Sequence, residues 1–326
     1  VMSLFKNTSA LGVTPEELNG CPMGTLGIPE FGTDFAMGML RDAKPQEFTD
    51  LIRISGLSHG TDVWLGNAQT LIENGTATIS TCICTRDDIM TYLIHMGLDS
   101  AEAFDIMEKT RKGIIAKGKC KQWPEWKQDM LDHGVPEWYT WSCEKIKYMF
   151  PKAHAAAYVM MAWRIAYCKV FYPLAYYAAF FSIRATSFSY ELMCQGKDKL
   201  EFYIAEYKKK DKLSAKEEGT LRDMRIVQEM YARGFEFLPL DLYKSDARYF
   251  QIVDGKLLPP FNSIDGMGDK AAESLAIAAS GGKFLSKDDL RERGKVSKSI
   301  IELLSDLDII SDLPESNQLS FFDFTA

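Results

Sequence analysis

The residues with the clearest chemical potential lie in the segment 149–158, MFPKAHAAAY. Pro151 suits the first turn of a helix, which places Lys152 and His154 at the helix N-terminus. Free backbone N–H groups and the positive end of the helix dipole favour an anion there, and phosphate is a common one. The small residues 155–157 keep the helix narrow, so a bulky ligand can approach. The alternative is an ordinary buried helix with a core histidine.

A second candidate is the segment 54–64, ISGLSHGTDVW. Gly56 and Gly60 bracket Ser58 and His59, which predicts a tight loop before the next helix. A Ser–His pair suggests a hydrolase, but adjacent residues rarely form the nucleophile–base hydrogen bond, and no Gly-x-Ser-x-Gly elbow is present. Two interpretations remain: capping and turn residues, or a loop that contacts a ligand.

A third candidate is the segment 260–275, in which Gly266 and Gly268 follow an apolar residue and precede an Ala-rich helix. This pattern indicates a helix-hairpin-helix, whose glycines let backbone N–H groups approach a phosphate without reading bases. Lys270 adds positive charge. Asp265 and Asp269 favour the alternative, a plain glycine turn between two helices. A second, poorer unit is predicted from Arg293 to a helix ending at Leu307.

A short apolar segment, 318–322 (QLSFF), lies in the acidic C-terminal end of the chain. Such a segment suits capture in the hydrophobic groove of a partner protein, with ordering on binding. The alternative is that it folds back onto its own domain.

Helix signals dominate the elements that must position these residues. Thr14-Pro15 predicts a helix start, further helices are expected over 43–54, 63–73, 86–97 and 99–112, and a basic loop is expected over 109–127. Alternation around Asp254-Gly255 predicts one β-hairpin within 248–258. The fold class expected is therefore mainly α with a small β-hairpin element.

Charge is distributed unevenly along the 326 residues. The net charge is −7, from 38 Lys and Arg against 45 Asp and Glu, which taken alone argues against a nucleic-acid binder. Six acids and no bases follow Lys298, so the preceding body has a net charge of −1. From Lys109 to Lys169 there are 12 bases against 5 acids. Nucleotide and DNA binding is compatible with that distribution.

Other compositional features narrow the class of protein. Seven cysteines, an odd number, do not suggest a secreted disulfide framework, and we expect reduced thiols in a cytoplasmic protein with no metal at Cys82 and Cys84. The longest uncharged apolar run, 170–183, is too short to span a membrane. No signal-peptide pattern is present. Because the chain begins at Val1 rather than Met, we expect a fragment of a longer protein.

Residues 54–64, 148–158 (YMFPKAHAAAY) and 318–322, in this order, closely resemble one family, and 164–173 continue the second segment in the same manner. The chain resembles the C-terminal part of a PolC-type DNA polymerase III alpha subunit, the replicative C-family polymerase of low-G+C Gram-positive bacteria. The resemblance implies polymerase fingers over 1–245, with a short remnant from the palm side at the start. A tandem helix-hairpin-helix region over 246–313 and a clamp-binding tail over 314–326 would follow.

The resemblance also implies roles for individual residues. Lys152 and His154 would bind the β- and γ-phosphates of an incoming deoxynucleoside triphosphate, with Arg86 as a second candidate. Tyr148 and Phe150 would shape the pocket near the base. Ser58 and His59 would lie near the nucleotide or the template.

In the remaining segments, Gly266, Gly268 and Lys270 would bind duplex DNA. Asp265 stands where the family usually has Pro. The sliding clamp would bind four tail residues: Gln318, Leu319, Phe321 and Phe322. Phe321 stands where the clamp-binding consensus has Leu.

The expected partners are primer–template DNA, deoxynucleoside triphosphates, the sliding clamp and other replisome subunits, in the bacterial cytoplasm and near the nucleoid. Mg²⁺ ions would be held by palm carboxylates outside this chain, so no catalytic residue is expected here and the fragment should not polymerise alone. The alternative is a stand-alone, non-enzymatic DNA- or clamp-binding module. The coding sequence upstream of Val1 distinguishes the two.

Overall fold

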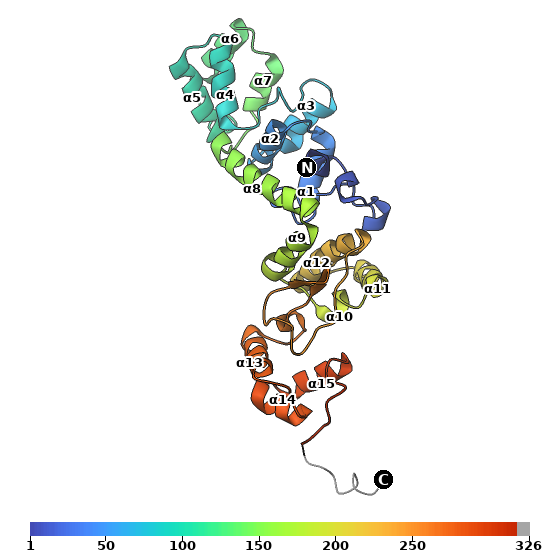
Figure 1. Ribbon diagram of the computed structural model, residues 1–326. Helices are drawn as coiled ribbons and strands as arrows, with labels where there is room; N and C mark the ends of the chain where they lie inside the picture. Colours follow the sequence, from blue (N-terminus) through green and yellow to red (C-terminus); the bar gives the residue numbers. More distant parts are fainter. Residues whose placement is uncertain (318–326) are drawn as a thin grey trace, which may run out of the picture. The chain divides into compact units, whose positions relative to one another are not determined.

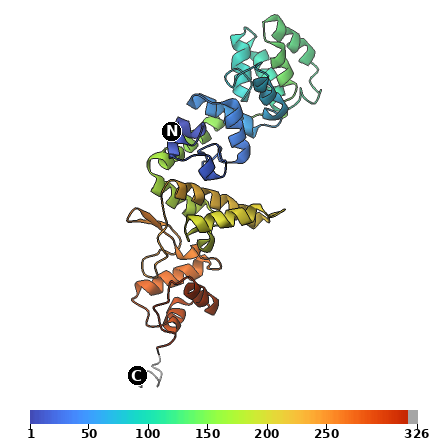
Figure 2. The same cartoon turned by 90° about the vertical axis from the view of Figure 1, so that its right-hand side faces the viewer.

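The computed structural model describes residues 1–317, which form a mainly helical structure with one two-stranded sheet (Figures 1 and 2). The expected fold class is confirmed. The described residues divide into two compact units, residues 1–15 with 21–167 and residues 16–20 with 168–317, and the boundary falls within helix α8. No helix of the described residues is long and apolar enough to cross a membrane.

The first unit contains the segments singled out at 54–64 and 148–158. Its helices are α1 (Asp34–Ala43), α2 (Phe48–His59), α3 (Gln69–Glu73), α4 (Arg86–His95), α5 (Ser100–Arg111), α6 (Trp123–Asp132), α7 (Glu137–Cys143) and the N-terminal part of α8 (Lys152–Phe171), with short helical turns at Met2–Phe5, Ser9–Leu11 and Trp64–Ala68. In both figures α4 and α5 lie side by side, and they share many contacts.

Helix α2 shows how the sequence builds this unit. Leu51, Ile54 and Leu57 recur at helical spacing and are each at most 1% exposed, so one face of α2 forms core. A capping box between Glu47 and Asp50 satisfies backbone N–H groups at its start. The helix therefore begins at a defined residue and buries a defined face.

The second unit contains α9 (Pro173–Ala179), α10 (Tyr190–Met193), α11 (Lys197–Lys208), α12 (Ala215–Ala232), α13 (Asp269–Ser280), α14 (Lys287–Gly294) and α15 (Lys298–Asp306), with short helical turns at Glu16–Leu18, Phe180–Arg184 and Phe261–Ser263. Lys169 and Glu229 form an ion pair at 2.8 Å and are both fully buried. The Tyr177 hydroxyl donates to the same carboxylate at 2.6 Å. An added hydrogen bond of this kind is what a buried ion pair needs to offset its desolvation.

The expected β-hairpin is present, with β1 (Gln251–Val253) antiparallel to β2 (Lys256–Leu258). Asp254 and Gly255 both have positive φ, 50° and 75°, as the two-residue turn of a twisted hairpin requires. After the hairpin, α13, α14 and α15 surround an apolar cluster that includes Phe261, Leu275 and Leu304.

Several expected elements differ in detail. Ser58 and His59 lie in the last turn of α2, not in a tight loop. The helix expected over 63–73 is interrupted, because Gly66 has a φ of 65°, and the start expected at Thr14-Pro15 forms only the short turn Glu16–Leu18. In the basic stretch 109–127, the first residues end α5 and the last lies in α6, so only the part between is irregular.

Candidate functional site

The end of α2 and the segment before α8 are joined by backbone hydrogen bonds. The Thr61 N–H donates to the Tyr148 carbonyl at 2.9 Å, and the Lys147 N–H donates to the Thr61 carbonyl at 3.1 Å. A Cβ on Gly60 would lie 2.9 Å from the Tyr148 carbonyl oxygen. Gly60 was expected as a turn residue. It is required because the two backbone segments, at Gly60 and at Tyr148, approach too closely for a side chain.

A second junction fixes the N-terminus of α8 to that of α4. The Arg86 N–H donates to the Phe150 carbonyl at 3.2 Å, and the Lys152 N–H donates to the Asp87 carboxylate at 2.6 Å. Asp87 thus satisfies one of the free N–H groups at the start of α8. The anion position expected there is partly filled by a carboxylate of the chain itself.

Between these junctions lies a row of rings, which we call the ring cluster: His59, Tyr148, Phe150, His154 and Tyr158. The centroid of Phe150 is 5.6 Å from Tyr148, 5.1 Å from His59 and 4.9 Å from His154. His154 is 4.5 Å from Tyr158, one turn further along α8. The structure therefore brings together three residues expected at the nucleotide, Tyr148, Phe150 and His154, with His59, expected near the nucleotide or the template. It adds Tyr158, which is 50% exposed.

Glu30 belongs to this site although nothing in the sequence singled it out. Its carboxylate pairs with Nε2 of His59, and its side chain is 13% exposed. Glu30 has a φ of 70°, a left-handed conformation that is uncommon for a non-glycine residue and is often found at functional sites. Glu30 lies 29 residues before His59 in the sequence. A separation of that length gives no spacing signal, so only the tertiary structure reveals the pair.

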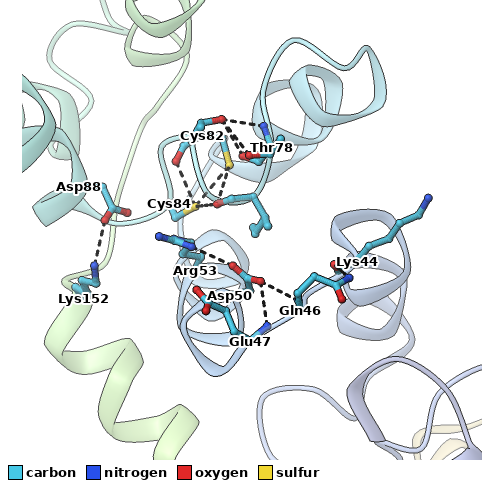
Figure 3. A network of polar contacts seen from close by, with 12 residues as sticks. Lys44, Gln46, Glu47, Asp50, Arg53, Thr78, Cys82, Cys84, Asp88 and Lys152 are labelled. Carbon is cyan, nitrogen blue, oxygen red and sulfur yellow. Dashed lines mark hydrogen bonds and ion pairs between the residues drawn. The ribbon is translucent and has the colours of Figure 1, made fainter. Parts of the chain in front are cut away.

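Lys152 and His154, expected to bind phosphates together, point to different neighbours. Residues two apart on a helix are about 200° apart around its axis. The ring of His154 packs in the ring cluster. Nζ of Lys152 lies 3.6 Å from the Asp88 carboxylate, and Figure 3 draws this ion pair. The Lys152 side chain is 44% exposed, so its ion pair faces solvent. The two groups flank the N-terminus of α8 from opposite sides.

The remaining residues expected near the nucleotide are Ser58, His59 and Arg86, and each has different neighbours. The Ser58 hydroxyl donates to the Ser55 carbonyl at 2.8 Å, a bond within α2. His59 is paired with Glu30, so each member of the suspected Ser–His pair bonds elsewhere, and the hydrolase interpretation gains no support. Arg86 is half-buried in the first turn of α4, next to the Phe150 backbone.

Cys82 and Cys84 are buried thiols whose Sγ atoms lie 3.6 Å apart (Figure 3). Burial raises the pKa of Cys84 well above its ordinary value, and the neighbouring Cys82 adds to this effect. Within residues 1–317 no group of three or more His, Cys, Asp or Glu side chains is arranged to hold a metal ion.

The hairpin at 264–268 combines a glycine of left-handed conformation with the N-terminus of α13. Gly266 has a φ of 85°, Gly268 precedes the first residue of α13, and Lys270 is exposed. Asp265 accepts a hydrogen bond from the Ser189 hydroxyl at 2.9 Å. Asp269 pairs with Arg248, and hydrogen bonding from the Asn262 amide, followed by the effect of Arg248, lowers the pKa of its carboxyl.

Both acids that seemed to oppose DNA binding are therefore engaged within the second unit. The two glycines line a hollow of about 450 Å³ together with Lys216 and the side chains of Thr186 and Thr220. In place of a full first helix, only the short turn Phe261–Ser263 precedes this hairpin.

The second, poorer unit expected near Arg293 consists of α14 and α15 joined by a turn in which Lys295 has a φ of 51°. Arg293 donates to the carbonyls of Lys283, Ala278 and Gly282 and pairs with Asp289. Its charge therefore stabilises the turn after α13. The tail residues Gln318, Leu319, Phe321 and Phe322 lie outside the described part of the chain.

The segments described above lie in parts of the chain that match known proteins. Residues 1–134 match the bacterial DNA polymerase III alpha subunit finger domain, and residues 234–319 match a helix-hairpin-helix motif. DNA polymerase III PolC-type from Caldanaerobacter subterraneus subsp. tengcongensis is 51% identical over 98% of this chain. The PolC-type polymerases of Streptococcus suis and Oceanobacillus iheyensis are each 51% identical over 99% of it.

The chain belongs to the PolC-type DNA polymerase III family. It spans 22% of the length of these PolC-type relatives. The finger match includes Glu30, His59 and Arg86, and the helix-hairpin-helix match includes the hairpin glycines. The segment 148–158 lies beyond the finger match but within the part of the chain that aligns with the PolC-type relatives.

Proposed function

We propose that this chain is the part of a replicative DNA polymerase that holds the incoming deoxynucleoside triphosphate and the primer–template duplex. The observation that carries the proposal is the ring cluster, which two backbone junctions fix beside the cationic residues Arg86 and Lys152. Aromatic faces for a base and cations for phosphates are the chemistry that a nucleotide needs.

In this proposal the base and sugar lie against the ring cluster. Tyr148 and Phe150 shape the pocket near the base, and His59, oriented by Glu30, faces Phe150. His154 is held at the N-terminus of α8, where its imidazole can donate to a phosphate oxygen. Ser58, at the end of α2, forms part of the wall of the pocket, and its hydroxyl does not bind the nucleotide.

Lys152 and Arg86 hold the β- and γ-phosphates. The Lys152–Asp88 pair is 3.6 Å long and partly exposed, and such pairs are weak, so a triphosphate can displace the carboxylate. Cations at this position neutralise negative charge on the leaving pyrophosphate and position it for transfer. Mg²⁺ would be held by carboxylates outside this chain, and the chain alone would not polymerise.

The second unit, in this proposal, grips the duplex through the backbone N–H groups at Gly266 and Gly268, with Lys270 beside them. We propose boundaries of 1–245 for the fingers, 246–313 for the duplex-binding region and 314–326 for a tail that binds the sliding clamp. Contacts of this kind bind phosphates regardless of base sequence.

Lys152→Ala in the full-length polypeptide tests the nucleotide site. We expect the KM for nucleotides to rise or kcat to fall by about tenfold or more, because a phosphate loses a charge-assisted contact. Lys121→Ala, which removes an exposed lysine from a turn outside the site, is the matched control. Unchanged steady-state kinetics in Lys152→Ala would remove Lys152 from the site.

A further inference from the structure

One face of α4 lines a hollow that shares only Lys152 with the proposed nucleotide site. Asp88, Thr91, Tyr92 and His95 recur at i, i+3, i+4 and i+7, so they share that face, and all four line the hollow. Its volume is about 550 Å³, within the range of roughly 300–1,000 Å³ typical of ligand pockets. Trp138 of α7 also lines this hollow.

The walls of this hollow are aromatic. Tyr92 stacks on Tyr139 with ring centroids 4.5 Å apart, and Trp138 lies 5.6 Å from Tyr139. Trp138 is half-buried, so part of its ring remains available to a planar ligand. The Tyr139 hydroxyl is buried and has no hydrogen-bond partner among the described residues. A buried hydroxyl without a hydrogen-bond partner is costly to the folded state.

The charges on the lining favour an anion. Arg53 and Lys152 contribute two positive charges and Asp88 one negative charge, and His95 is exposed. Arg53 also pairs with Asp50 at 3.0 Å, from the same turn of α2 (Figure 3). With histidine neutral, the lining therefore has a net charge of +1. That balance suits a single phosphodiester better than a triphosphate, which carries several negative charges.

We propose that this hollow binds an unstacked base of single-stranded DNA, with the adjoining phosphodiester beside Arg53. Stacking between bases and aromatic side chains accepts any base, and a cation beside the stack holds the backbone. The source of the strand, an unpaired template segment, rests on the proposed polymerase function, whereas the base pocket itself rests on the geometry of α4 and α7.

Binding of primer–template DNA with a four-nucleotide template overhang tests the proposal. The full-length polypeptide is titrated with DNA in which each overhang base in turn is replaced by an abasic residue, so that the phosphate stays and the base is lost. We expect one abasic position to weaken binding by about tenfold, the scale of one lost base–aromatic stack. In Trp138→Ala, that abasic position should no longer weaken binding relative to the intact overhang.

Trp126→Ala is the matched control, because Trp126 is also a half-buried tryptophan but lies in α6 outside the hollow. It should keep the abasic effect. Thr91→Phe, at an exposed position, fills the hollow without removing a core side chain and should abolish the effect as Trp138→Ala does.

Two results would overturn the proposal. One is an abasic scan with the same pattern in wild type, Trp138→Ala and Thr91→Phe. The other is an abasic scan in which no overhang position weakens binding to the wild-type polypeptide. A failed nucleotide site is recognised separately, since Lys152→Ala would then leave the KM for nucleotides unchanged whatever the abasic scan shows.

Discussion

Asp87 links the two helices that frame the ring cluster, so its removal tests how the site is built. Its carboxylate accepts the Lys152 N–H at 2.6 Å from a position in the first turn of α4. Loss of a side chain that caps a helix costs about 1 kcal/mol, with a range of roughly 0.5–2. The favourable interaction of Asp87 with the dipole of α4 adds about 0.3–1 kcal/mol.

Asp87→Ala should therefore destabilise the junction by about 1.3–2 kcal/mol. Because the junction holds Phe150 and Lys152 in place, we expect kcat/KM for nucleotide incorporation to fall by about tenfold, the ratio that corresponds to 1.4 kcal/mol. Asp87→Asn keeps an acceptor oxygen and should stay within about threefold of wild type, losing mainly the dipole interaction. Steady-state incorporation by the full-length polypeptide measures both.

The opposite outcome has a clear meaning. If Asp87→Ala lowers the KM for nucleotides, the freed Lys152 N–H is itself a phosphate ligand, and Asp87 competes with the substrate for it. If Ala and Asn variants both match wild type, the junction does not organise the site. Either result would refute the positioning role given to Asp87.

Three further predictions concern the second unit and the tail. Burial raises the pKa of Asp223 to about 6, so the folded state binds its proton more tightly than the unfolded state. Stability should therefore fall as pH rises from about 4 to about 6, and Asp223→Asn should flatten that slope in urea titrations; an unchanged slope would contradict the assignment. Gly266 and Gly268 replaced by Val should weaken duplex binding and reduce its salt dependence, and an equal affinity would count against the hairpin. Deletion of 318–322 should abolish clamp-stimulated processivity but spare distributive synthesis; persistent clamp binding would show the motif reading to be wrong.

Local signals in the sequence predicted the elements that depend on neighbouring residues. Helices were expected from 86 and from 99, and α4 and α5 begin directly after the capping residues Thr85 and Asp99. Asp254-Gly255 predicted the only β-hairpin of the described residues, because a two-residue turn needs positive φ at both positions. The prediction of a loop at Ser58 was wrong, because the glycines on either side allow neighbouring segments to pack closely. Gly56 lies within α2 against the Cys84 carbonyl.

The sequence by itself determined the mainly helical class, the positions of the caps and the grouping of Tyr148, Phe150 and His154 on one segment, since these depend on propensity and spacing. Only the tertiary structure decided that Glu30 pairs with His59 and that Asp87 caps α8 from 65 residues away. It also decided that Lys152 pairs with Asp88 while His154 packs in the ring cluster. Partners distant in the chain are chosen by packing, which turns each side chain toward whichever charge or ring its helix happens to face.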